Sequence, residues 1–248
     1  MKLDLNADVG EGMAADEALL GIVTSASIAC AAHAGDEASM RAAIDLCLKH
    51  GVGIGAHPGY ADRANFGRMP HALPPQDIAA LVADQTRLLM RLTGEAGGRV
   101  MHVKPHGALS NQAMADRDIA RAIAQGIASA SPDLIFLAPS GSAMVSAGRE
   151  MGLKVVEEIF ADRAYDRQGF LVPRSQAGAV LHDPSLVAER TLFWLKTGRM
   201  KALSGKEIPL PGQSVCLHGD TAEAVAIAQT LRHRLLAEGV TLAQLSLL

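Results

Sequence analysis

Short apolar segments alternate with longer segments of helical periodicity along the whole chain, and this alternation restricts the fold more than any other feature. Repeated strand–helix units build a parallel sheet that is buried on both faces. The expected strands are Lys2–Asn6, Ser27–Ala31, Gly53–His57, Arg99–Lys104, Leu134–Ala138, Lys154–Phe160 and Ser214–His218. The expected helices are Asp16–Val23, Ala38–His50, Pro75–Thr93, Asp116–Ala130, Gly141–Met151, Pro184–Thr197 and Thr221–Ala237.

No change of composition and no low-complexity segment separates these units, so we expect residues 1–248 to form a single α/β domain. A closed barrel and an open doubly wound sheet both satisfy the pattern, and a β/α barrel commonly takes about 250 residues. Two insertions, Pro58–Pro74 and Asp162–Asp183, interrupt the alternation. Loops of that length inside a compact domain are more often functional than idle.

Composition excludes several classes of function. The chain has 23 basic and 26 acidic side chains and only 3% aromatic residues, so it lacks the basic surface and the stacking platform of a nucleic-acid-binding protein. The apolar stretches are too short for a membrane-spanning helix, and the first residues do not form a secretory signal. Cys30, Cys47 and Cys216 form no CxxC pair, which is typical of a cytoplasmic protein with buried thiols.

Ionisable residues follow six of the seven expected strands at their carboxyl ends, where the sites of parallel α/β folds are built. These residues are Asp8 and Glu11, His33, His57, Lys104 and His106, Asp162 and Arg163, and His218 and Asp220. Because each set lies at the same end of its strand, we expect them to surround one site.

The residue types suggest roles for this set. Asp8 and Glu11 are candidates for general-base chemistry, since paired carboxylates in unequal environments can divide acid and base roles. Lys104 would bind an anionic or carbonyl oxygen, or pair with Asp8 or Asp162, because an unpaired buried ammonium is costly. His106 could donate a proton.

Other residues are candidates for substrate contacts. Arginine guanidinium groups bind carboxylates and phosphates, and the insertions contribute Arg68, Arg163 and Arg174. His33 and His57 with a carboxylate could hold a divalent metal ion, or bind a polar substrate as neutral imidazoles. The residues leave both possibilities open. The chain has neither a GxxxxGK[ST] phosphate loop nor a GxSxG nucleophile motif.

Several motifs resemble the LamB/YcsF family, whose members form one component of ATP-dependent 5-oxoprolinase. The resemblance extends in register over most of the chain. It is carried by DLNADVGEG (4–12), SIACAAHAGDE (27–37), GAHPGY (55–60), FGR (66–68), HVKPHGALSN (102–111), FADRAY (160–165), LVPR (171–174) and HGDT (218–221).

The resemblance implies a seven-stranded, TIM-like β/α barrel of the glycoside hydrolase/deacetylase type. It also implies cleavage of the lactam of 5-oxoproline to L-glutamate, with hydrolysis of magnesium-bound ATP, in a cytoplasmic complex with 5-oxoprolinase subunits B and C. On this basis we expect catalytic roles for Asp8, Glu11, Lys104, His106 and Asp162. We expect substrate binding by His33, His57, Arg68, Arg163, Arg174, His218 and Asp220.

Two other functions fit the residues. One is a metal-dependent amide or carbohydrate deacetylase-like hydrolase that uses Asp8, His33 and His57 without ATP. The other is a non-catalytic subunit that binds 5-oxoproline and delivers it to a partner.

Overall fold

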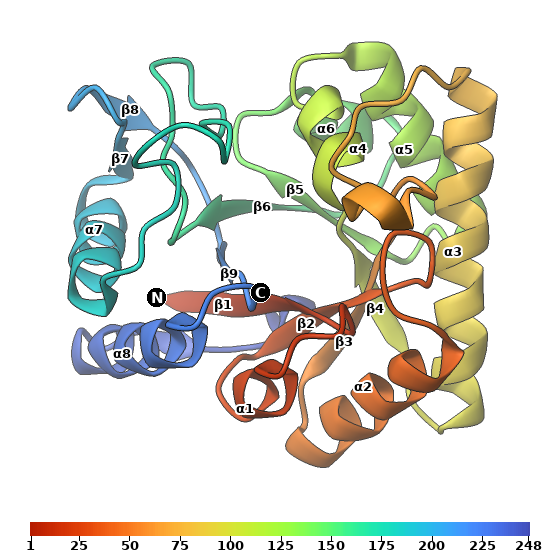
Figure 1. Ribbon diagram of the computed structural model, residues 1–248, viewed down its shortest axis with the longest axis horizontal. Helices are drawn as coiled ribbons and strands as arrows, with labels where there is room; N and C mark the ends of the chain where they lie inside the picture. The colour runs from red at the N-terminus through yellow and green to blue at the C-terminus, as the bar shows by residue number, and fades with distance from the viewer.

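A closed barrel of seven parallel strands forms the centre of the molecule in the computed structural model, which describes residues 1–248 (Figure 1). The strands pair in chain order, and β9 closes the barrel by pairing with both β6 and β1. This confirms the barrel that the family resemblance implies and excludes the open sheet. The strands are β1 (Lys2–Val9), β2 (Ser25–Ala29), β3 (Gly53–His57), β4 (Val100–Val103), β5 (Ile135–Pro139), β6 (Val155–Phe160) and β9 (Ser214–Leu217).

Eight helices surround the barrel, and α7 and α8 lie side by side on its outer surface (Figure 1). No helix combines the length and apolar character needed to cross a membrane. The helices are α1 (Asp16–Leu20), α2 (Glu37–His50), α3 (Pro75–Glu95), α4 (Gly107–Ala113), α5 (Arg117–Ala130), α6 (Ala143–Glu150), α7 (Pro184–Thr197) and α8 (Ala224–Ala237).

Aspartate caps explain where three of these helices begin. The Asp36 carboxylate accepts the backbone N–H of Ser39 at the start of α2, and Asp116 and Asp183 accept backbone N–H groups at the starts of α5 and α7. Such caps satisfy N–H groups that have no partner within the helix.

The elements missed by the sequence analysis are short. They are α4, the antiparallel hairpin of β7 (Arg199–Lys201) and β8 (Glu207–Pro209), strand β10 (Thr241–Leu242) beside β1, and the 3-10 turns Arg63–Asn65 and Leu245–Leu247. Segments this short carry too little periodicity to be recognised. The predicted end of the first strand, Asn6, is also too early, because residues as far as Val9 pair with β2.

The barrel separates an apolar layer from a polar interior. On β1 the side chains of Leu3, Leu5 and Ala7 belong to the large hydrophobic cluster that packs the strands against the helices. The alternate residues of β1 make polar contacts across the barrel, where the Asn6 amide donates to Glu158 of β6. Asp4, Asn6 and Asp8 therefore share the inward face of β1, because side chains alternate between the two faces of a strand.

A glycine makes room for a histidine inside the barrel. A Cβ atom on Gly55 of β3 would overlap the imidazole ring of His102 on β4. The His102 ring is fully buried and lies 3.2 Å from the Ser27 hydroxyl. Burial and the charge of Lys104 lower the pKa of His102 to about 3, so this ring is a neutral part of the interior.

The polar interior predicts a pH-dependent stability that depends on Asp4. Burial raises the pKa of this carboxyl to about 6, although the Ser214 and Thr24 hydroxyls donate to it. A raised carboxyl pKa contributes stability that is complete below the unfolded value of 3.8 and is lost as the pH rises through about 6.

We therefore expect the free energy of unfolding of Asp4→Asn, relative to that of wild type, to increase by about 3 kcal/mol as the pH rises from below 3.8 to above 6. Urea unfolding of both proteins at several pH values measures the difference. A difference that stays constant with pH would show that the Asp4 carboxyl keeps its ordinary pKa in the folded chain.

Candidate active site

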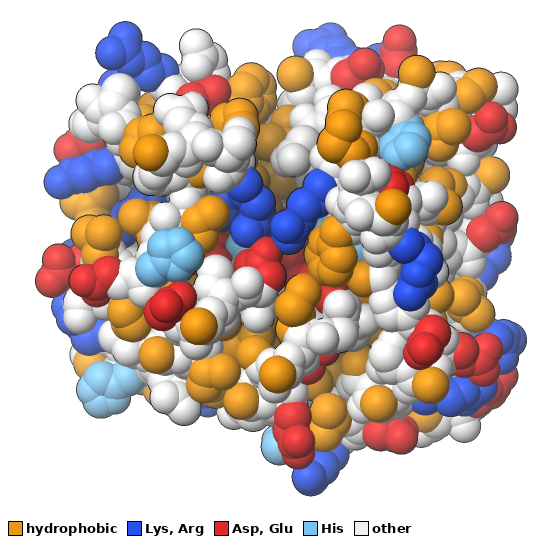
Figure 2. All heavy atoms as spheres, viewed as in Figure 1, with side chains coloured by type: hydrophobic (Ala, Val, Ile, Leu, Met, Phe, Trp, Pro, Cys, Tyr) orange, Lys and Arg blue, Asp and Glu red, His pale blue; other side chains and the backbone are white.

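The carboxyl ends of the strands surround a cavity of about 440 Å³. The face drawn in Figure 2 is hollowed near its centre, and basic and acidic side chains gather around the hollow. Ten of the twelve residues expected at the site line this cavity: Asp8, Glu11, His57, Arg68, Lys104, His106, Arg163, Arg174, His218 and Asp220. The other two, His33 and Asp162, lie behind the lining and contact Glu11 and His218.

Lys104 lies at the centre of a buried network near the carboxyl ends of the barrel strands. Its Nζ atom lies 2.6 Å from Oδ1 of Asp8 and 3.5 Å from Oε2 of Glu158. It also donates to the Asn6 side-chain oxygen at 2.9 Å and to Sγ of Cys216 at 3.1 Å. Of the partners considered from the sequence, the structure brings Asp8 to Lys104 and not Asp162.

These charges hold one another in their ionised forms. Burial disfavours a charged Asp8, but the positive charges of His57 and Lys104 outweigh it and hold the pKa of Asp8 well below its usual value. Burial likewise opposes the Lys104 ammonium, and the Asp8 carboxylate raises the pKa of Lys104 well above its usual value. Burial raises the pKa of Glu158. Asp8 and Lys104 therefore form a permanent ion pair.

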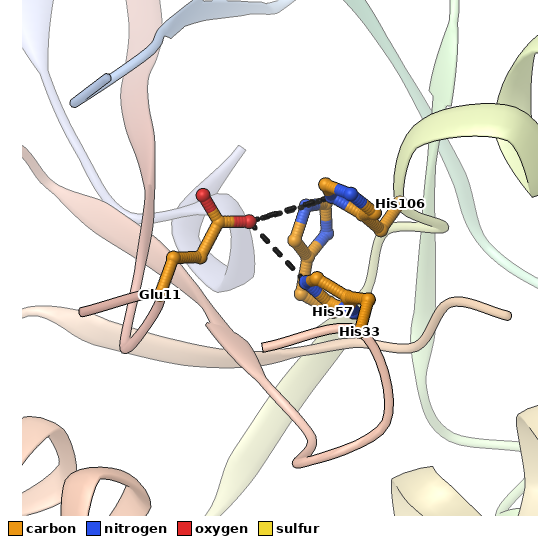
Figure 3. A group of neighbouring side chains, drawn as sticks. All are labelled: Glu11, His33, His57 and His106. Atoms are coloured by element: carbon orange, nitrogen blue, oxygen red, sulfur yellow. Dashed lines mark hydrogen bonds and ion pairs between the residues drawn. The ribbon is translucent and has the colours of Figure 1, made fainter. Parts of the chain in front are cut away.

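A second group, which we call the histidine cluster, lies beside this network and consists of Glu11, His33, His57 and His106. Its residues come from the carboxyl ends of β1 to β4, and Figure 3 shows the Glu11 carboxylate facing the three imidazole rings. Oε1 of Glu11 lies 3.3 Å from Nε2 of His33, 3.4 Å from Nδ1 of His106 and 3.9 Å from Nε2 of His57.

The rings of the cluster differ in charge. Burial and the neighbouring His57 lower the pKa values of both His33 and His106 to about 3, so these two rings are neutral. Burial acts on His57 in the same direction, but the Asp8 carboxylate outweighs it and raises the pKa of His57. Burial also raises the pKa of Glu11.

The Pro58–Pro74 insertion covers the histidine cluster. Its backbone bends at Gly67, where φ is +61°, and a Cβ atom there would lie 2.8 Å from the His33 side chain. The carbonyl oxygen of the adjacent Phe66 lies 2.8 Å from Nε2 of His106. The FGR segment therefore needs its glycine because the loop passes directly over two of the rings.

Asp162 orients His218 on the opposite wall. Its carboxylate accepts the His218 backbone N–H at 3.0 Å, and its Oδ1 lies 2.9 Å from Nδ1 of the same ring. Burial opposes the charged carboxylate, but His218 outweighs it and lowers the pKa of Asp162. Because Nδ1 faces this acceptor, Nε2 is the ring nitrogen of His218 that the contact with Asp162 leaves open, and in the neutral ring it carries the lone pair.

Two arginines at the cavity, Arg68 and Arg174, hold one carboxylate, and a third, Arg163, lies buried in the cavity wall. Arg68 and Arg174 lie 2.8 and 2.9 Å from the same oxygen of Asp220. Arg163 is almost fully buried and donates to the carbonyl oxygens of Val172 and Ala179. Burial and the neighbouring Arg174 lower the pKa of Arg163 to about 10, which leaves it charged at neutral pH.

Glu158 was not among the site residues expected from the sequence. It lies on β6 with its side chain fully buried, within reach of both Lys104 and Asn6. Two adjacent glutamates inside an otherwise apolar strand, Glu157 and Glu158, are an unusual feature that could have been noticed. The three cysteines were expected to be buried and are; burial raises the pKa of Cys30 to about 12 and that of Cys216 well above its usual value.

Removal of Lys104 should destabilise the chain strongly, because the Asp8 and Glu158 carboxylates would be left without their cation. We expect Lys104→Met to cost roughly 3–5 kcal/mol of unfolding free energy and the double variant Asp8→Asn/Lys104→Met to recover part of this loss. Denaturant unfolding at neutral pH measures both. Lys196→Met, which breaks an exposed pair with Glu238, serves as a control and should change stability little. Equal effects of the two lysine substitutions would contradict the proposed importance of the buried network.

Comparison with known proteins gives relatives of the whole chain. The chain is 46% identical over 254 aligned residues to the 5-oxoprolinase A-component of Nitrobacter winogradskyi, and the match covers all of both proteins. The crystal structure of a lactam utilization protein from Thermus thermophilus is 38% identical and superposes with a TM-score of 0.90 over 98% of this chain and 99% of that one.

A more distant structure shares the fold alone. The catalytic domain of a peptidoglycan N-acetylglucosamine deacetylase from Eubacterium rectale is 11% identical, with a TM-score of 0.53 over 98% of this chain and 88% of that one.

The sequence profile of the LamB/YcsF family matches residues 3–248. The chain therefore belongs to the LamB/YcsF family.

Proposed function

We propose that this chain is the lactam-binding, ring-opening component of an ATP-dependent 5-oxoprolinase that converts 5-oxoproline to L-glutamate together with subunits B and C. The observation that carries the proposal is the full-length, 46% identical relative that bears the name of the 5-oxoprolinase A-component. The cavity supports it, since it combines cationic groups at its mouth with proton-transferring groups on its walls.

The arginines at the mouth suit an anionic substrate. 5-Oxoproline carries a carboxylate beside its lactam ring, and Arg68 and Arg174 already hold a carboxylate, that of Asp220. We propose that the substrate carboxylate, or a phosphoryl group, binds to the guanidinium groups of Arg68, Arg163 and Arg174. Asp220 then neutralises and positions this set of cations.

Within this proposal His218 acts as the general base in place of the carboxylates Asp8 and Asp162, for which the sequence implied catalytic roles. Asp162 is buried and occupied by His218, and Asp8 is occupied by Lys104 and His57. His218 lies on the cavity wall with one ring nitrogen fixed by Asp162 and the other free. Such a ring can take a proton from water as the water adds to the lactam carbon, and return it to the ring nitrogen as the C–N bond breaks.

A lactam is a poor acyl donor, so ATP would supply the driving force as a co-substrate by phosphorylating the lactam oxygen, with Mg²⁺ bound to its phosphates. The chain has no glycine-rich phosphate loop. Its arginines fit the anionic group but do not define a nucleotide site, so we assign only binding, orientation and proton transfer to this chain. Opening of the phosphorylated ring by the first water gives an acyl phosphate, and a second water releases phosphate from it. The overall balance is 5-oxoproline, ATP and two waters giving glutamate, ADP and phosphate.

The complex provides the first test of this proposal. We expect glutamate release from 5-oxoproline only when ATP, Mg²⁺ and all three subunits are present, because the energy source and the ring-opening site lie on different chains. Glutamate and ADP are measured in the same reactions. Turnover by this chain alone without ATP would favour a hydrolase of the deacetylase type, and 5-oxoproline binding without any turnover in the full mixture would favour a non-catalytic delivery subunit.

The role of His218 gives a second test in the assembled complex. We expect His218→Asn to lower kcat by about 100-fold or more while the complex still assembles, since a general base contributes at least this factor. The matched control is His182→Gln, which changes an exposed histidine outside the cavity lining and should leave kcat unchanged. A His218→Asn complex with wild-type kcat would exclude His218 as the proton carrier.

A further inference from the structure

The proton positions in the histidine cluster favour a cation among its rings. Nδ1 of His57 lies 2.6 Å from the carbonyl oxygen of Lys104, and Nε2 of His106 lies 2.8 Å from that of Phe66. A carbonyl oxygen can only accept a hydrogen bond, so each of these ring nitrogens carries a hydrogen. In a neutral ring the remaining nitrogen then carries a lone pair.

Those two remaining nitrogens face each other. Nε2 of His57 and Nδ1 of His106 are 3.1 Å apart, and Oε1 of Glu11 lies 3.9 and 3.4 Å from them. When His57 is neutral, as binding of a cation through Nε2 requires, the two imidazoles and the carboxylate present only lone pairs to one another. The cation would then take the place of the proton that Asp8, 3.4 Å from the same Nε2, favours on His57. A positive charge between these atoms would replace their mutual repulsion with attraction.

The distances match the coordination shell of a small metal ion. Ligand atoms about 2.1 Å from a tetrahedral metal lie about 3.4 Å from one another. One ligand atom from each of the four residues lies within 4.8 Å of every other, and four of the six pairs are separated by 3.1–3.9 Å. The backbone carbonyls behind His57 and His106 also fix the ring orientation, as such acceptors do behind metal-binding histidines.

We infer that the histidine cluster binds one divalent metal ion of the zinc type. The imidazole nitrogens of His57 and His106 and the Glu11 carboxylate oxygen suit zinc, cobalt or nickel, with a fourth position open to water, whereas Mg²⁺ prefers an all-oxygen shell. The site is therefore distinct from the magnesium that accompanies ATP. His33 supports these ligands from behind, because its ring is stacked parallel to that of His106 and cannot share an ion with it. Asp8 belongs to the surroundings of the ion and not to its ligands, because its carboxylate is paired with Lys104.

An ion bound by these residues would lie at the wall of the cavity. Glu11, His57 and His106 line the cavity, while His33 stacks behind His106 with ring centroids 3.7 Å apart. Glu11 lies in the loop between Gly10 and Gly12, both of which have positive φ, and not in a strand. It is thus the ligand that a water or a substrate oxygen can replace most easily.

Metal binding by the purified full chain tests this inference without lactam, ATP or partner subunits. The result of this test is therefore independent of the proposed function. The chain is stripped with a chelator, dialysed and titrated with Zn²⁺, and the bound metal is counted by elemental analysis. We expect one ion per chain, no displacement by excess Mg²⁺, and the visible spectrum of four-coordinate cobalt when Co²⁺ is used instead.

Variants locate the ion. Glu11→Gln, His57→Gln and His106→Gln should each weaken Zn²⁺ binding by about 100-fold or more, since even changes behind the ligands commonly cost 10–100-fold. His182→Gln is the control on the surface. Thermal unfolding of each metal-free variant checks folding, and Glu11→Gln decides the question if a buried histidine variant fails to fold.

Two results would overturn the inference. One is the absence of stoichiometric Zn²⁺ binding by the folded, stripped chain. The other is binding that survives these three substitutions but is lost in His218→Asn, which would place the ion in the neighbouring group of Asp8, Cys216 and His218.

Discussion

The ion pairs of the buried Lys104 ammonium are the interactions on which the carboxyl-terminal end of the barrel depends. A lysine inside a strand barrel is tolerated only with compensating charge, and Asp8 from β1 and Glu158 from β6 supply it from two strands that do not neighbour β4. The same contacts fix the position of the first strand relative to the fourth and sixth. Because Asp8 also faces His57, the ion pair sets the charge of the histidine beside it. Structure and chemistry share one network here, so a change at Lys104 alters both.

The site has two parts with different mechanical origins. Lys104, Asp8 and the imidazoles of the histidine cluster stand on or soon after β1 to β4, and Glu11 of that cluster lies in the loop that follows β1. Arg68, Arg163 and Arg174 come from the two insertions, which lie outside the strands and helices of the barrel. A reacting or metal-binding group needs fixed geometry, whereas recognition of a carboxylate or phosphate tolerates a longer, adaptable arm. This division suits the proposed lactam substrate, which has a small ring and a charged end.

Much of this arrangement follows from the sequence because parallel strands have a common polarity. Ionisable residues after six strands had to meet at one end once the barrel closed, and ten of the twelve expected residues line one cavity. The closure itself required the family resemblance, since seven strand–helix units alone also fit an open sheet. Pairings inside the site could not be predicted: Lys104 had two equally plausible carboxylate partners, and the choice depends on strand stagger in three dimensions. Glu158 was missed for a related reason, because local patterning does not show which glutamate of Glu157 and Glu158 points inward.

The comparison with the distant deacetylase shows that the barrel fold alone does not determine function. At 11% identity the strands still superpose, so the fold tolerates almost complete replacement of its side chains. Function must then lie in the groups at the strand ends and in the inserted loops. In this chain, two backbone carbonyls direct the free nitrogens of His57 and His106 toward each other, and one of those carbonyls, at Phe66, belongs to an insertion. The loop that covers the cluster therefore also sets its proton positions. A family member could gain or lose affinity for a cation by changing this loop, without altering any histidine.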